Sequence, residues 1–180
     1  MKKVLFIALV CVCSATFAQQ PISYSKVIQT DSVGKDALFA SINEWFASTY
    51  NSAKDVLQMT DKDAGIIVGN GNTKYSYGGM IYSCYEGWLK YSIKVNVKDN
   101  RYKVEITNIS HSNKQGNAKN CELGLVSTAD EYATKGASKS YHNKVWNDIK
   151  QKMEAYAEKV FVSMENHTKD VKNINSDNDW

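Results

Sequence analysis

Hydrophobic and polar residues alternate most regularly between Trp88 and Ile109. In the first half of this segment the apolar positions are Leu89, Tyr91, Ile93, Val95 and Val97. After Asp99-Asn100 the apolar positions are Tyr102, Val104 and Ile106. A period of two predicts two strands, each with one buried side and one side in solvent. A two-residue turn at Asp99-Asn100 joins them as a hairpin.

The position of the turn determines which residues lie opposite each other. Counting outward from it pairs Lys98 with Arg101, Val97 with Tyr102, Val95 with Val104 and Ile93 with Ile106. Lys94 then lies opposite Glu105. A slip of one residue would place apolar residues opposite polar ones, so the pattern specifies this register strongly.

Two other segments place apolar residues three or four positions apart, as amphipathic helices do. The first runs from about Gly34 to Tyr50, with a stripe of Leu38, Ile42, Trp45, Phe46 and Thr49. Asp31 and Ser32 are the expected N-cap residues of this helix. The second runs from about Tyr141 to Met164, with a stripe of Trp146, Ile149, Met153, Tyr156 and Val160. Both helices are available to cover the buried side of the hairpin.

The remaining segments predict shorter elements. The expected strands are Ile22–Thr30, Val56–Met59 and Gly65–Val68, and Gly69, Gly71, Gly78 and Gly79 indicate a loop or a bulged strand. Residues 111–140 form a long polar connection, which is usually functional or loosely ordered. The sequence therefore predicts one α+β domain over residues 19–165, followed by a polar tail over 166–180. Its order is β-α-β-β-β-β-α, with an antiparallel sheet and two helices packed on one face.

The N-terminus has the pattern of a secretory signal peptide over residues 1–18. Lys2 and Lys3 precede the apolar run Val4–Val12, and small residues follow up to Ala18. Cleavage after Ala18 would leave Gln19 first and place the protein in the periplasm or outside the cell. The apolar run is far shorter than the roughly 20 residues of a membrane span, and no second run follows, so no span is predicted.

The predicted cleavage changes the charge balance and the cysteine count. The chain has 22 Lys and Arg against 19 Asp and Glu, so removal of Lys2 and Lys3 leaves 20 against 19, a net charge of +1. Such a near-neutral protein has no general electrostatic attraction to nucleic acid, and none is predicted as a partner. Cys84 and Cys121 remain, either as a disulfide or as separate thiols.

Catalytic and cofactor motifs are weak in this sequence. Gly65, Gly69 and Gly71 lack the Lys-Ser/Thr pair of a phosphate-binding loop, so turn glycines are favoured. The histidines, His111, His142 and His167, have no second His or Cys at metal-ligand spacing. Neither a metal site nor a cofactor is therefore predicted. A hydrolase that uses Glu86 or Glu122 with His111 remains an alternative.

The solvent side of the predicted hairpin is the main candidate for binding. Its cations are Lys90, Lys94, Lys98, Arg101 and Lys103, and a tyrosine-rich stretch precedes it. We select Lys94, Lys98, Arg101 and Lys103, with Tyr82 and Tyr85 nearby, as candidate ligand-binding residues. The partner would be an envelope glycan or protein, bound on the open sheet face or on the 111–140 connection. A surface that is merely solvated, in a purely structural envelope component, is the other alternative.

Three segments carry a resemblance to a known family. They are Ser32–Phe39 with Trp45-Phe46, then Asp55–Gln58 with Gly65–Gly71, then Lys98–Lys103 with Ile106–Ile109. Together they resemble the bacterial secreted family called domain of unknown function 4468, over roughly residues 22 to 165. The resemblance implies a TATA-box-binding-protein-like (TBP-like) fold, in which helices cover one face of an antiparallel sheet. It supplies no catalytic or ligand-binding residues.

Overall fold

The computed structural model of the chain describes residues 20–50, 52, 56–114, 119–134, 136 and 138–169. The predicted signal peptide, residues 1–18, lies outside this part. The described residues form an antiparallel sheet whose strands follow the order β1-β5-β4-β3-β2, while the short β6 pairs with β5 beyond β1. The strands are β1 Tyr24–Gln29, β2 Leu57–Asp61, β3 Ile66–Tyr75, β4 Gly87–Lys98, β5 Arg101–Asn113 and β6 Gly124–Leu125.

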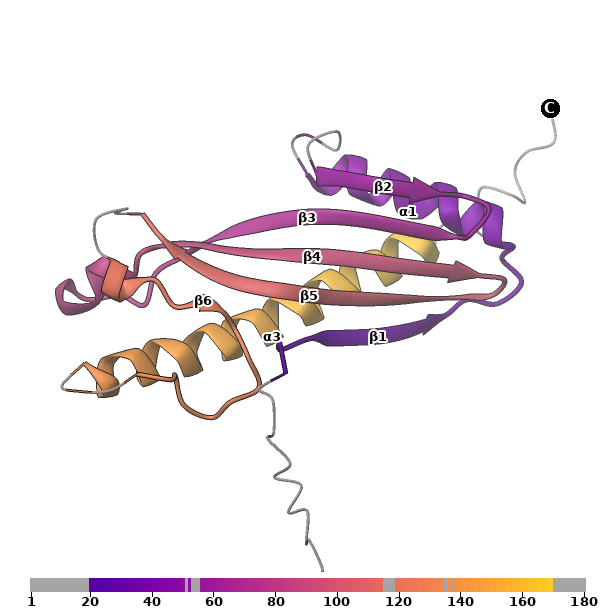
Figure 1. Ribbon diagram of the computed structural model, residues 1–180. Helices are drawn as coiled ribbons and strands as arrows, with labels where there is room; N and C mark the ends of the chain where they lie inside the picture. Colours follow the sequence, from indigo (N-terminus) through magenta and orange to yellow (C-terminus); the bar gives the residue numbers. More distant parts are fainter. Residues whose placement is uncertain are drawn as a thin grey trace, which may run out of the picture.

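Two long helices cover one face of this sheet and leave the other face open (Figure 1). They are α1, Lys35–Thr49, and α3, Lys139–Lys169, and α3 runs diagonally behind the strands. The predicted α+β class and the packing of two helices on one face are confirmed, and β6 is an additional strand. Neither described helix combines the length and the hydropathy needed to cross a bilayer.

The β4–β5 hairpin has the predicted register near its turn. Val97 lies opposite Tyr102, Val95 opposite Val104 and Ile93 opposite Ile106. Farther out, a bulge in β5 breaks the simple count between Lys90 and Ser92 of β4. Asn108, at a φ of 54°, lies in the bulge and adopts the left-handed backbone that Asn tolerates better than most residues. The extra residue shifts the alternation, so that Ile109 and His111 point to the buried side.

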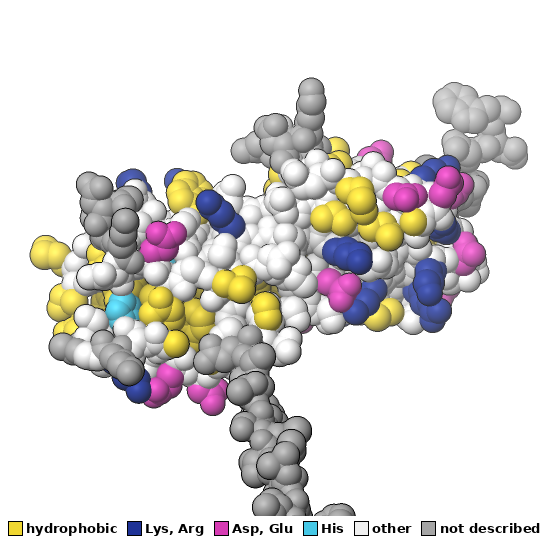
Figure 2. All heavy atoms as spheres, in the orientation of Figure 1, with side chains coloured by type: hydrophobic (Ala, Val, Ile, Leu, Met, Phe, Trp, Pro, Cys, Tyr) yellow, Lys and Arg dark blue, Asp and Glu magenta, His cyan; other side chains and the backbone are white. Residues whose placement is uncertain are grey.

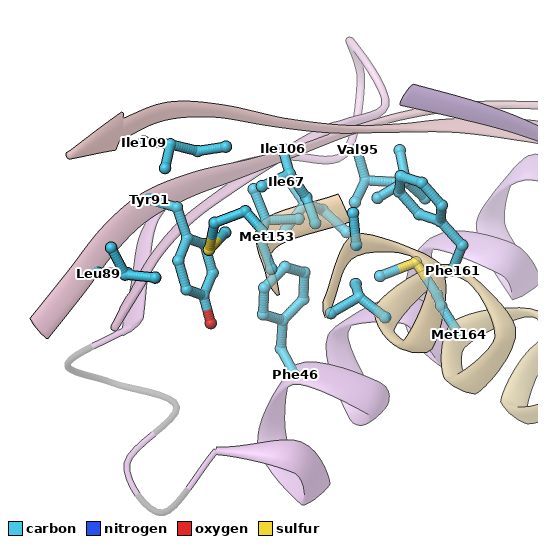
Figure 3. Close-up of a cluster of buried hydrophobic side chains, with 14 of the residues drawn as sticks. Phe46, Ile67, Leu89, Tyr91, Val95, Ile106, Ile109, Met153, Phe161 and Met164 are labelled. Carbon is cyan, nitrogen blue, oxygen red and sulfur yellow. The ribbon is translucent and has the colours of Figure 1, made fainter. Parts of the chain in front are cut away.

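The core lies between the sheet and the two helices (Figure 3). Phe46 of α1 and Met153, Phe161 and Met164 of α3 pack against the strand residues Ile67, Tyr91, Val95 and Ile106. The predicted stripes of both helices are largely buried. Thr49 is the exception, because it lies in the last turn of α1 and is exposed. Burial of both helix stripes and one strand face provides the main favourable free energy of folding.

The predicted N-cap of α1 is wrong. The helix begins at Lys35 with Gly34 as its N-cap, so Asp31 and Ser32 lie too far upstream to cap it. The Lys35 amide instead donates a hydrogen bond of 2.8 Å to Oδ1 of Asp99 in the hairpin turn. Because a carboxylate is favourable at a helix N-terminus, this contact couples the start of α1 to the β4–β5 turn.

The first two glycines of the predicted loop lie inside β3, which continues without interruption to Tyr75. Gly69 and Gly71 face the helix side, where aromatic rings approach the backbone. A Cβ at Gly69 would lie 2.9 Å from the Phe46 ring, and one at Gly71 would lie 2.6 Å from the Tyr91 ring. These glycines therefore make room for core rings, and Gly78 and Gly79 occupy the expected loop.

The described part of the connection after β5 contains a strand, and residues 166–169 of the predicted tail belong to a helix. Within the connection, β6 pairs with Ser110 and His111 of β5. At the other end, α3 continues to Lys169, beyond the predicted domain boundary at 165. Thr168 is only 1% exposed, and its hydroxyl is hydrogen-bonded to that of Tyr102 at 2.9 Å. The predicted tail over 166–180 thus begins inside the helix.

The two sides of the hairpin can be distinguished by neighbouring substitutions. Val95 is completely buried, whereas Lys94 is exposed on the open face. Val95→Asp should lower the free energy of unfolding by several kcal/mol, because it buries a charge without a partner. Lys94→Asp should cost about 1 kcal/mol or less. Urea denaturation of both variants measures this difference, and equal losses would contradict the described packing.

Candidate functional site

The face of the sheet opposite α1 and α3 is left uncovered by both helices. Strand alternation places every second residue of β1, β3, β4 and β5 on this face, and the view in Figure 2 looks onto it. Charged side chains gather toward the end that contains the β4–β5 turn, while the middle is largely uncharged. The face is thus divided along its length into regions of different chemistry.

The end near the turn carries the four predicted cations. Lys94 and Lys98 lie on β4, and Arg101 and Lys103 lie on β5. Lys103 forms an ion pair of 2.7 Å with Glu105. Among the described residues, Lys94, Lys98 and Arg101 have no ion-pair partner within 4.0 Å.

Lys98 and Arg101 lie directly opposite each other across the hairpin turn. Like charges in this position repel each other and destabilise a strand pair. Both side chains are exposed, so solvent screens much of the repulsion. An anion placed between Lys98 and Arg101 would be attracted to both side chains, which would offset their mutual repulsion.

A shallow hollow of about 410 Å³ lies beside these two cations. Its lining includes Val27 of β1, Asn96 of β4, the cations Lys98, Arg101 and Lys103, and one acid, Glu105, which accepts a hydrogen bond of 3.4 Å from Asn96. Val27 is 52% exposed and supplies an apolar wall, while Asn96 supplies an amide. With three cations and one acid, the hollow combines a net positive charge, a hydrogen-bonding group and a small apolar surface. The sequence pattern identified its lysines and arginine but gave no sign that Val27 from β1 completes it.

The middle of the open face is built from neutral polar side chains. The Ser92 hydroxyl donates a hydrogen bond of 2.8 Å to Oδ1 of Asn70, and Asn108 donates one of 3.4 Å to Ser92. These bonds connect β3, β4 and β5 across the surface. The middle region separates the cationic end, near the β4–β5 turn, from the opposite end of the sheet, where β4 begins.

The structure does not bring Tyr82 and Tyr85 to the cationic region. Both lie in the 3₁₀ helix Met80–Tyr85, before the start of β4. Tyr85 is buried against α3, with its hydroxyl 2.9 Å from Nδ1 of His142, and the Tyr82 ring packs near Tyr141 of the same helix. Lys94 lies seven residues along β4 from Gly87, which is about 23 Å of extended strand. The predicted combination of these tyrosines with the lysines is therefore wrong.

His111, which the alternative hydrolase would use, is held by two backbone groups. It is buried, and its Nε2–H donates a hydrogen bond of 2.9 Å to the Tyr85 carbonyl. Its Nδ1 accepts a bond of 3.2 Å from the Leu123 amide. Both ring nitrogens are thus engaged with backbone groups, which defines the neutral tautomer with the proton on Nε2. Burial lowers the His111 pKa, although the bond to Tyr85 and the charge of Glu122 oppose this shift.

The two candidate acids lie in different hollows. Glu86 lines one together with Trp88 and Lys114. Glu122 lines another together with Tyr132 and His142, whose Nδ1 is occupied by Tyr85. Among the residues that the structure describes, no group of three or more His, Cys, Asp or Glu side chains is placed to hold a metal ion.

Cys84 and Cys121 are joined by a disulfide with a Cα–Cα distance of 5.8 Å. Cys84 belongs to the 3₁₀ helix Met80–Tyr85, and Cys121 ends the 3₁₀ helix Lys119–Cys121 in the long connection. The bond links segments 37 residues apart in the sequence. It therefore restrains both segments at the same end of the sheet.

Comparison with known proteins identifies the family of the strand-rich part. Residues 24–112 match the family model described as a domain of unknown function (DUF4468) with TBP-like fold. This segment belongs to the DUF4468 family. The family resemblance inferred from the sequence is thereby confirmed. No curated protein matches the chain.

Two solved structures have a similar fold. A DUF4468 family protein from Bacteroides ovatus has a TM-score of 0.62 and 17% identity, covering 82% of this chain and 86% of its own. A TBP-like protein from Parabacteroides distasonis has a TM-score of 0.56 and 18% identity, covering 83% of this chain and 93% of its own. At such low identity the similarity establishes the fold alone.

The buried histidines predict a loss of stability at mildly acidic pH. Burial lowers the pKa of both His111 and His142 in the folded state. The unfolded chain, with histidine pKa values of about 6.5, then binds protons that the folded protein does not. The contribution of these two histidines to the free energy of unfolding should therefore be fully present above about pH 6.5 and should decrease as the pH falls below that value.

The double variant His111→Gln/His142→Gln provides the comparison, because glutamine does not titrate. Urea denaturation at pH 7 and pH 5 should show a smaller loss of unfolding free energy for this variant than for the wild type. An identical pH dependence in both proteins would mean that these histidines titrate alike when folded and unfolded.

Proposed function

We propose that this DUF4468 protein is an exported, non-catalytic binding module. Its binding site is the hollow beside Lys98 and Arg101 on the open sheet face. The observation that carries this proposal is that two cations without an ion-pair partner among the described residues face each other on a surface that neither α1 nor α3 covers. The proposed ligand is an acidic polysaccharide of the cell envelope.

The chemistry of the hollow fits a sugar that bears a carboxylate. Arg101 offers a planar guanidinium, which can bind both oxygens of a carboxylate. Asn96 offers hydrogen bonds for hydroxyl groups, and exposed Val27 offers an apolar surface for the C–H face of a sugar ring. Lys98 adds long-range attraction that falls with ionic strength.

Export is part of this proposal and rests on two observations. The first is the signal-peptide pattern over residues 1–18. The second is the Cys84–Cys121 disulfide, because such bonds persist mainly in oxidising compartments.

Intact-mass measurement of the protein purified from its native host tests export directly. The expected mass is that of a chain beginning at Gln19, with Cys84 and Cys121 oxidised. Reduction followed by alkylation should then label these two cysteines only. A chain that retains Met1, or that begins with a lipidated cysteine, would contradict this part of the proposal.

Binding is tested with polygalacturonate, using its methyl ester as the neutral control ligand. Lys98→Gln/Arg101→Gln should weaken polygalacturonate binding by about tenfold or more, because two charge-assisted contacts are lost. Isothermal titration calorimetry at low and high salt measures the affinity. The wild type should weaken with salt much more than the variant does.

Lys144→Gln/Lys159→Gln provides the matched control, because it changes the net charge equally on the exposed side of α3. This control should bind like the wild type. The proposal fails if both double variants lose the same affinity, if the methyl ester binds as tightly as the acid, or if duplex DNA binds more tightly than polygalacturonate.

A further inference from the structure

The opposite end of the molecule carries an unusually exposed apolar tip. Met80 is 91% exposed and Ile81 is 72% exposed, the two highest values among the exposed large hydrophobic residues of the described chain. Both begin the 3₁₀ helix Met80–Tyr85, which connects β3 with β4 at the narrow end of the molecule away from the β4–β5 turn (Figure 1). Apolar side chains also gather at this end in Figure 2. Exposed apolar surface of this kind commonly marks an interaction site.

The tip is held in its exposed position by the surrounding structure. The Tyr82 amide donates a hydrogen bond of 3.1 Å to the Gly79 carbonyl, which closes the first turn of the 3₁₀ helix. Cys84 is bonded to Cys121, and Tyr85 is buried. Because its C-terminal half is anchored twice, the helix cannot turn Met80 and Ile81 into the core without breaking these contacts.

A group of tyrosines lies directly behind the tip. The Tyr77 and Tyr82 rings are 4.2 Å apart, and the Tyr82 and Tyr141 rings are 5.8 Å apart. Tyr141 is itself 43% exposed. Tyrosine combines an apolar ring with a polar hydroxyl, and it is enriched where proteins meet the boundary between lipid headgroups and acyl chains.

We infer that Met80 and Ile81 insert into the acyl layer of a lipid bilayer, with the tyrosines at headgroup level. Met80 and Ile81 are largely exposed, and neither lines any of the hollows described above. Protruding aliphatic side chains without a surrounding groove suit a fluid apolar phase, which requires no shape complementarity. A protein partner would instead have to supply a matching socket.

The charges near the tip indicate which lipids it binds. The hollow next to Trp88 is lined by two cations, Lys74 and Lys114, and one anion, Glu86, so its net charge is only +1. Association should therefore occur with neutral phosphatidylcholine and depend little on salt, unlike polysaccharide binding at the cationic end. Two inserted side chains give weak and reversible attachment, comparable to the effect of a single short lipid anchor.

Flotation with phosphatidylcholine vesicles tests this inference. The chain beginning at Gln19 is used, because the apolar run Val4–Val12 would itself bind lipid. The wild type should float with the vesicles, and Met80→Ser/Ile81→Ser should reduce the bound fraction by about tenfold. Both positions are exposed, so the substitutions should leave the thermal unfolding midpoint unchanged.

The matched control is Leu125→Ser/Val162→Ser, which removes two apolar side chains that are 53% and 47% exposed elsewhere on the surface. This control should float like the wild type, and so should Lys98→Gln/Arg101→Gln. The inference is overturned if the wild type fails to float or if both serine variants lose binding equally. It is also overturned if light scattering shows that the tip mediates a dimer and not lipid binding.

Discussion

The burial of one side of the β4–β5 hairpin beneath α1 and α3 is the constraint on which the rest of the structure depends. Ile93, Val95 and Val97 can leave water only if their polar neighbours stay in it, because successive strand residues point to opposite faces. The same alternation therefore builds the core and the open cationic face. The hairpin turn also supplies Asp99 to the N-terminus of α1, so the position of this helix depends on the register of the strands.

Tyrosine hydroxyls of the sheet and of the 3₁₀ helix Met80–Tyr85 connect these elements to α3 through this otherwise apolar layer. Tyr24 donates to the Lys150 carbonyl at 2.9 Å and Tyr75 donates to Asp148 at 2.7 Å. Tyr85, Tyr91 and Tyr102 are hydrogen-bonded to His142, Tyr156 and Thr168. Each pair satisfies polar groups that would be costly to bury alone. The same desolvation raises the pKa of Tyr24 and of Tyr102 to about 12, which keeps these hydroxyls neutral and suits a structural role.

The surface that remains is divided between two ends of an elongated molecule. The turn end has unpaired cations beside a hollow, and the opposite end has a disulfide-anchored apolar tip. The neutral region around Asn70 and Ser92 separates them. The two proposed contacts, with an acidic polymer at one end and with lipid at the other, rest on different physical forces. Electrostatic attraction weakens with salt and apolar insertion does not, so the two proposals can be tested separately.

The sequence by itself determined the elements whose signals are local. Period-two alternation and one turn were enough for the hairpin register near the turn, though not for the bulge at Asn108. The three- and four-residue spacing was enough for both helices. The tertiary structure decided what depends on contacts between distant residues. Gly69 and Gly71 leave room within β3 for the rings of Phe46 and Tyr91. Asp99 accepts a hydrogen bond at the start of α1 in place of the expected cap. Both ring nitrogens of His111 are hydrogen-bonded to the backbone of Tyr85 and Leu123. Val27 joins Lys98 and Arg101 only because β1 pairs with β5 across more than seventy residues. Sequence periodicity describes which side of an element is apolar, but not which other element will cover it.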